Sequence, residues 1–114
     1  MLTKRTIHIP IYDFNVEVTV FDNIEEAQKE YPDYMTNGIL ACTLEYIGCS
    51  KCKLIIPCDS YSDIVHELEH VKNLVWKAKG YRPQEGNDEP DAYLLGWLFK
   101  QVDKIIKKHL ALNS

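Results

Sequence analysis

Residues 66–70 carry the side chains whose types and spacing are best suited to chemistry. They read His66-Glu67-Leu68-Glu69-His70, an H-E-x-x-H pattern inside a segment with helical periodicity. Residues four apart lie on one face of a helix, so the two imidazoles can point at the same metal ion. Glu67 can then reach a water molecule at that ion and take a proton from it. This arrangement is what a zinc-dependent hydrolase needs.

The same short pattern also arises by chance on a solvated helix face that is rich in glutamate and histidine. A catalytic zinc site has three protein ligands and a fourth, open position. Glu89 is the best candidate for the third ligand, because it opens the next predicted helix, 19 positions beyond His70. The loop over residues 81–88 would have to fold back over the first helix, and its Pro83 and Gly86 permit that.

The helix that carries the pattern is predicted over residues 61–79. Ser60 or Ser62 is a suitable N-cap, and Gly80 is a natural residue to follow the last turn. Its apolar positions form one broad face (Ile64, Val65, Leu68, Val71, Leu74, Val75 and Ala78). A separate polar stripe at i, i+4 and i+7 holds the two histidines and Asn73.

The second long helix is predicted to start near Glu89, with Asn87 or Asp88 as its N-cap and Pro90 in its first turn. Ala92 and Gly96 are small and four positions apart. Another helix can therefore approach this one closely at that point.

The first half of the chain has the two-residue alternation of strands. Residues 6–12 and 15–21 are predicted to form a hairpin, and residues 39–47 and 53–57 a second pair. Pro10 cannot donate to a sheet ladder, so we expect the first strand at an edge or at a bulge.

A short helix over residues 24–30, capped by Asp22 or Asn23, is predicted between the two pairs. The whole pattern predicts one α+β domain over residues 1–114. In it a small, mainly antiparallel sheet with a short helix (1–59) packs on a half with two long helices that holds the metal site (60–114).

Four cysteines invite comparison with a structural zinc site. Cys49 and Cys52 form a C-x-x-C in the predicted turn of the second hairpin, while Cys42 and Cys58 lie about 20 Å away along the strands. Four thiolates cannot meet on one ion across that distance. A metal or redox role for Cys49 and Cys52 alone, or four free thiols, both remain open.

Composition excludes several classes of protein. The 114 residues are 46% hydrophobic and 26% charged, and their net charge of −4 comes without a basic stripe. We therefore expect no nucleic-acid partner. No apolar run approaches the roughly 20 residues that span a bilayer, and the N-terminus lacks a signal-peptide pattern. We expect no membrane partner and a cytoplasmic address.

The two helical motifs together resemble a known family. His66-Glu67-x-x-His70 followed by Glu89-Pro-Asp-Ala-Tyr-Leu-Leu-Gly-Trp97 is similar to the gluzincin branch of zinc metallopeptidases. It looks most like the small zincin-like proteins encoded by phages and prophages, in which a short antiparallel sheet precedes the H-E-x-x-H helix. The resemblance covers roughly residues 60–100.

The resemblance implies a role for each matching residue. His66, His70 and Glu89 would bind one Zn²⁺ per chain, and Glu67 would act as the general base. The phenol of Tyr93 could donate to a developing oxyanion, although a packed helix tyrosine explains it equally well. Asn73 and Asp88 are weaker candidates for groups that orient the imidazoles.

The chain departs from the larger peptidases in size, because 114 residues leave no room for a second lobe that would form a wall of the substrate cleft. The leading hypothesis is a small metallopeptidase acting on a peptide or protein, with a protein partner completing the cleft or a small substrate. The alternative is a non-catalytic zincin-like accessory or interaction protein.

Overall fold

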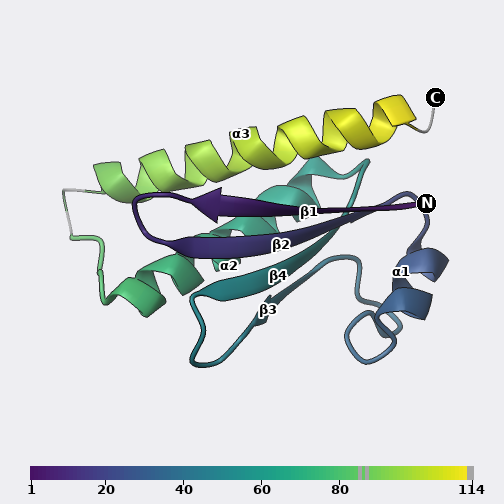
Figure 1. Ribbon diagram of the computed structural model, residues 1–114, viewed down its shortest axis with the longest axis horizontal. Helices are drawn as coiled ribbons and strands as arrows, with labels where there is room; N and C mark the ends of the chain where they lie inside the picture. The colour runs from purple at the N-terminus through teal and green to yellow at the C-terminus, as the bar shows by residue number, and fades with distance from the viewer. Residues whose placement is uncertain (85, 87, 113–114) are drawn as a thin grey trace.

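The computed structural model describes residues 1–84, 86 and 88–112 of the chain. Within them, strands and helices follow in the order β1 (Leu2–Ile9), β2 (Phe14–Phe21), α1 (Ile24–Glu30), β3 (Cys42–Glu45), β4 (Lys51–Pro57), α2 (Tyr61–Lys79) and α3 (Glu89–Leu112) (Figure 1). The predicted α+β class, with two long helices on a small sheet, is confirmed.

The sheet has the strand order β1-β2-β4-β3 and is mixed. β1 pairs antiparallel with β2, and β3 antiparallel with β4, as predicted. Between the two hairpins, β2 and β4 run parallel, with Phe21 opposite Pro57. The sequence did not reveal this pairing. It arises because α1 and the segment after it carry the chain to the far edge of the sheet. There β3 runs antiparallel to β2, and β4 then returns alongside β2 in the same direction.

The predicted bounds of three strands were wrong. β4 begins at Lys51 instead of residue 53, so Cys52 belongs to the strand and not to the predicted turn. β1 begins at Leu2 instead of residue 6 and ends at Ile9, because Pro10 has no N–H and residues 10–13 form a turn. Its position at the edge of the sheet is as predicted. β3 covers only Cys42–Glu45 of the predicted 39–47, and lies at the opposite edge.

The two long helices cover one face of the sheet, α2 over β3 and β4 and α3 over β1 and β2 (Figure 1). Alternate residues of β2 and β4 point into this core, among them Val16, Val18 and Leu54. Ile55 points to the other face, where α1 and the following loop cover it in a smaller cluster with Phe21. The strand alternation therefore decides which helix each side chain meets.

Helix ends follow local chemistry. The Asn23 side chain accepts the N–H of Glu25 at 2.9 Å and starts α1. Gly80 ends α2 in a left-handed conformation (φ 68°), so both predicted bounds of that helix are confirmed. Ser60 occupies the N-cap position of α2, but its hydroxyl donates to the Asp63 carboxylate at 2.7 Å and caps no backbone N–H.

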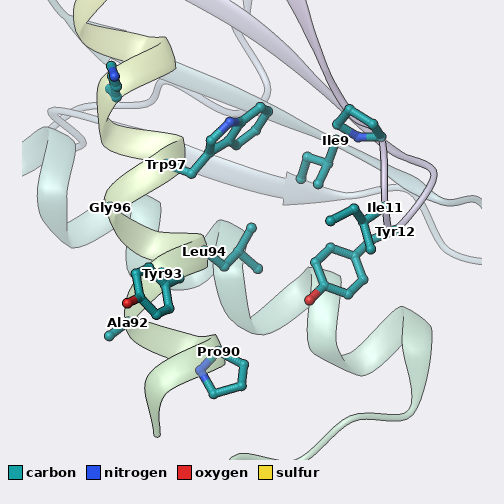
Figure 2. A pocket seen from close by; sticks show the side chains of 11 residues that line it. Ile9, Ile11, Tyr12, Pro90, Ala92, Tyr93, Leu94, Gly96 and Trp97 are labelled. Atoms are coloured by element: carbon teal, nitrogen blue, oxygen red, sulfur yellow. The ribbon is translucent and has the colours of Figure 1, made fainter.

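Among the described residues, no helix packs against Ala92 and Gly96. Both residues are exposed, and a Cβ placed on Gly96 would meet nothing within 4 Å. They line an apolar groove of about 570 Å³ instead (Figure 2). One wall of this groove is formed by α3, and the other by the turn after β1, which contains Ile11. The core-facing side of α3 carries larger residues such as Leu94 and Leu98.

A polar clamp joins α3 to α2. Lys72 is only 5% exposed and its ammonium lies 2.7 Å from Asp91 and 2.7 Å from Glu69. The indole N–H of Trp76 donates to the other oxygen of Asp91, also at 2.7 Å. Asp91 therefore fixes the first turn of α3 against the second half of α2.

Candidate metal centre

α2 presents His66 and His70 side by side on its outer surface. Their Nε2 atoms lie 3.3 Å apart, and the two rings meet edge to face with their centroids 4.9 Å apart. The side chain of His66 is 69% exposed. One turn of helix suffices for this arrangement, because residues at i and i+4 stack on one face.

The separation of the two nitrogens suits a shared metal ion. Zinc–nitrogen bonds of about 2.0–2.1 Å at a tetrahedral angle place two imidazole nitrogens about 3.3–3.4 Å apart. A hydrogen bond from one neutral imidazole to the other has a similar length. The ligand atoms of His66, Glu67 and His70 all lie within 4.8 Å of one another. This group can hold a metal ion.

Glu67 is held in place by the neighbouring strand. Its side chain points inward and the residue is 8% exposed. The hydroxyl of Thr43 in β3 donates to Oε1 at 2.8 Å, while Oε2 lies 3.9 Å from Nε2 of His66. One carboxylate oxygen is therefore anchored and the other faces the histidine pair. This is suitable geometry for a proton acceptor beside a metal ion.

A cleft of about 470 Å³ opens beside this group. Glu67, His70 and Asn73 of α2 line one side of it. The other side consists of β3 and the segment before it (Tyr34, Ile39, Ala41, Cys42, Thr43 and Glu45). β3 is also an edge strand, so one side of its backbone has no neighbouring strand among the described residues. The loop before β3, which contains Tyr34, thus contributes a wall.

The two predicted site residues on α3 lie elsewhere. Glu89 is exposed at the first residue of the helix, and in the described part of the chain its carboxylate is not among the ligand atoms gathered at the histidine pair. Tyr93 is 74% exposed and lines the groove of Figure 2 with Trp97, whereas His70 lines the separate cleft. A zinc-binding role for Glu89 and an oxyanion role for Tyr93 stay predictions.

Asn73 and Asp88, the residues predicted to orient the imidazoles, lie in different places. Asn73 lines the cleft beside His70, where it can contact a ligand of that site. The backbone carbonyl of Asp88 accepts the N–H of Ala92 at 3.0 Å, so it serves the start of α3. Asn87 lies outside the described residues.

The four cysteines are free thiols. Cys52 belongs to β4 and is fully buried in the main core, where burial raises its pKa to about 12. Its exposed neighbour Cys49 lies in the preceding turn. No metal-ligand group among the described residues includes these two, and a thiol with so high a pKa is a poor redox nucleophile. Burial, then Asp22, also raises the pKa of Cys58 above its ordinary value.

Thr43 and Asp91 are the residues that sequence reasoning missed here. Each acts across a tertiary contact, Thr43 from β3 to Glu67 and Asp91 from α3 to Lys72. Asp91 had a weak signal, because it stands two residues after the expected ligand Glu89 in the first turn of the same helix. Thr43 had none, since threonine is ordinary in a strand.

Comparison of the chain with protein-family models, curated proteins and solved structures gives no match. Among the residues that the structure describes, no helix combines the length and apolar character required to cross a bilayer.

Proposed function

We propose that this chain is a small zinc-dependent hydrolase that cleaves peptide bonds, with His66 and His70 as metal ligands and Glu67 as general base. The observation that carries the proposal is the pair of imidazole nitrogens 3.3 Å apart beside an anchored carboxylate. Two imidazole nitrogens suit zinc, and the proposal assigns the third protein ligand to Glu89.

A zinc ion at this position would supply Lewis acidity, which lowers the pKa of a water molecule and polarises a carbonyl oxygen. The protein groups have separate tasks. Glu67 accepts the proton of the attacking water at Oε2 and returns it to the leaving amine. Thr43 keeps Oε1 engaged, so that the proton-accepting oxygen stays turned toward His66.

The edge strand favours an extended peptide as substrate. A peptide laid along β3 would pair with the outer backbone groups of that strand and pass the mouth of the cleft. Tyr34 and Ile39 would then contact its side chains. Glu89 as third ligand and Tyr93 as oxyanion donor belong to the proposal as groups that the start of α3 would have to bring to the histidine pair.

Elemental analysis of the purified protein tests the metal site. We expect the wild type to hold about one zinc per chain more than His70→Ala. His8→Ala is the matched control, since His8 is an exposed histidine on β1 that hydrogen-bonds Asn15. Loss of zinc in Glu89→Ala would support Glu89 as a ligand. A wild type that holds no more zinc than His70→Ala, even after zinc is added, would refute the proposal.

Hydrolysis of an unstructured protein substrate tests catalysis. Glu67→Gln should lower the rate at least about a hundredfold while zinc stays bound, because the amide cannot accept the proton. Glu69→Gln, on the same helix, is the control and should keep the rate. Full activity in Glu67→Gln would overturn the role of this residue.

A non-catalytic, metal-binding accessory protein is the second candidate. It is favoured by one observation, that in the described residues Glu89 does not join the two histidines. A wild type that holds zinc at His66 and His70 but cleaves no substrate would support this candidate over the hydrolase.

A further inference from the structure

The parallel pairing of β2 and β4 brings two potential metal ligands to one end of the sheet. Phe21 and Pro57 are the last paired residues of the two strands, so Asp22 and Cys58 leave the sheet side by side. The N–H of Cys58 donates to the carbonyl of Phe21 at 3.0 Å and continues the ladder by one bond. The thiol of Cys58 lies 3.5 Å from Oδ1 of Asp22.

The last turn of α3 adds a histidine to this pair. His109 is completely buried, and its Nε2 lies 2.7 Å from Oδ1 of Asp22. Its other ring nitrogen, Nδ1, lies 2.5 Å from the hydroxyl of Thr3 in β1, and Thr3 is only 4% exposed. The second oxygen of Asp22 is 3.6 Å from the Met1 amino group.

The ligand atoms of Asp22, Cys58 and His109 all lie within 4.8 Å of one another. Thiolate, imidazole and carboxylate are the three protein ligands that zinc uses most. Metal-bound histidines also characteristically engage their second ring nitrogen in a hydrogen bond that fixes the ring, as Thr3 does here. The side chain of Asp22 is 35% exposed, so water can reach a fourth position.

We propose that Asp22, Cys58 and His109 form a second metal site, independent of His66 and His70, that takes Zn²⁺ or a divalent ion of similar ligand preference. On binding, the S–H bond of Cys58 breaks, the sulfur lone pair coordinates the metal, and the proton passes to solvent. The bound ion would join the end of α3 to the ends of β2 and β4. Its role is to hold these three segments together.

The geometry does not suit a cysteine nucleophile. A nucleophilic thiol needs a base that takes its proton, and a third group that orients the base. Here the carboxylate of Asp22 stands between the other two and contacts both, so His109 is not placed as the base of Cys58. The remaining alternative is a hydrogen-bonded cluster without metal, and it is one outcome of the test.

Cobalt(II) substitution distinguishes the outcomes, because a cobalt–thiolate bond gives an intense near-ultraviolet charge-transfer band that nitrogen and oxygen ligands do not give. We expect this band in the wild type and in the double variant His66→Ala/His70→Ala. It should be absent in Cys58→Ser. Cys49→Ser is the matched control and should keep it, since Cys49 is an exposed thiol in a turn.

Competing zinc should abolish the band, and zinc should raise the melting temperature of the wild type more than that of Cys58→Ser. Asp22→Asn provides a second variant at an exposed position and should weaken cobalt binding at least tenfold. A wild type without the band, or an equal band in Cys58→Ser, would overturn the metal site and leave the hydrogen-bonded cluster. The variant His66→Ala/His70→Ala keeps this second site. Failure of the second-site proposal can therefore be told apart from failure of the proposed hydrolase.

Discussion

The two candidate metal sites differ in how the fold builds them. His66, Glu67 and His70 come from little more than one turn of α2, and both histidines are exposed. Asp22 and His109 meet from opposite ends of the chain, and the histidine is completely buried. A site within one helix depends little on the rest of the molecule. A site assembled from several elements is also part of what holds them together.

Their chemistry differs as well. The helical site offers two imidazole nitrogens and the Glu67 carboxylate beside a cleft, which suits an ion that must meet a substrate. The site at the end of the sheet includes the sulfur of Cys58 and faces the core on one side. This comparison predicts that changes at the first site affect function first, and changes at the second affect stability first.

The largest expected effect is a difference in stability between variants of the buried His109 and the exposed His70. Without added metal, His109→Ala should lower the free energy of unfolding by about 3 kcal/mol, because it leaves a cavity and removes the partner of Thr3 and Asp22. His70→Ala should stay within about 0.5 kcal/mol, since that side chain is exposed. Urea unfolding measures both. Similar losses for the two variants would contradict the contrast.

The next largest loss of stability is expected at the polar clamp, in which Asp91 of α3 contacts Lys72 and Trp76 of α2. Asp91→Asn should lower the free energy of unfolding at neutral pH by about 2 kcal/mol, because it leaves the buried ammonium of Lys72 poorly compensated. Glu89→Gln, two residues earlier and exposed, is the control and should change stability by less than about 0.5 kcal/mol.

Acid should reveal the same clamp. Burial raises the pKa of Asp91, but hydrogen bonds from Lys72 and Trp76 outweigh it and hold the pKa below its ordinary value. A depressed carboxyl pKa stabilises the fold above the unfolded pKa and loses that contribution as pH falls through the folded pKa. The wild type should therefore lose stability below about pH 4, more steeply than Asp91→Asn. Equal slopes in pH-dependent urea unfolding would contradict the assignment.

A pair of threonine variants sharpens the comparison. Thr3→Val and Thr43→Val each remove one buried or partly buried hydroxyl and should each cost about 1 kcal/mol. Thr43→Val should also slow substrate hydrolysis while zinc remains bound, since Glu67 loses its anchor. Thr3→Val should leave hydrolysis unchanged. Thr6→Val, at an exposed position of β1, is the control for both in urea unfolding.

The smallest effect has the opposite sign. Gly96→Ala should raise the free energy of unfolding by about 0.5–1 kcal/mol, because alanine favours the helix and its Cβ meets nothing at this position. A destabilised variant in thermal or urea unfolding would mean that another segment covers this face of α3.

Local pattern was enough to predict much of this molecule. The sequence predicted the bounds of α2, Tyr61–Lys79, because helix periodicity and a left-handed glycine after the last turn (Gly80) act within a few residues. The same short range brings His66 and His70 together. The strand alternation predicted the α+β class for a similar reason, since burial of one face imposes a two-residue period.

Contacts between distant segments were decided only by the tertiary structure. The parallel pairing of β2 and β4 depends on the path of the chain through α1, and no local signal encodes it. That pairing placed Asp22 beside Cys58, and the packing of α3 added His109. Likewise, the first turn of α3 meets α2 through Asp91, while Glu89 two residues earlier stays exposed. Residues two apart on a helix face different directions, so the rotation of α3 against its neighbours determined which carboxylate was used.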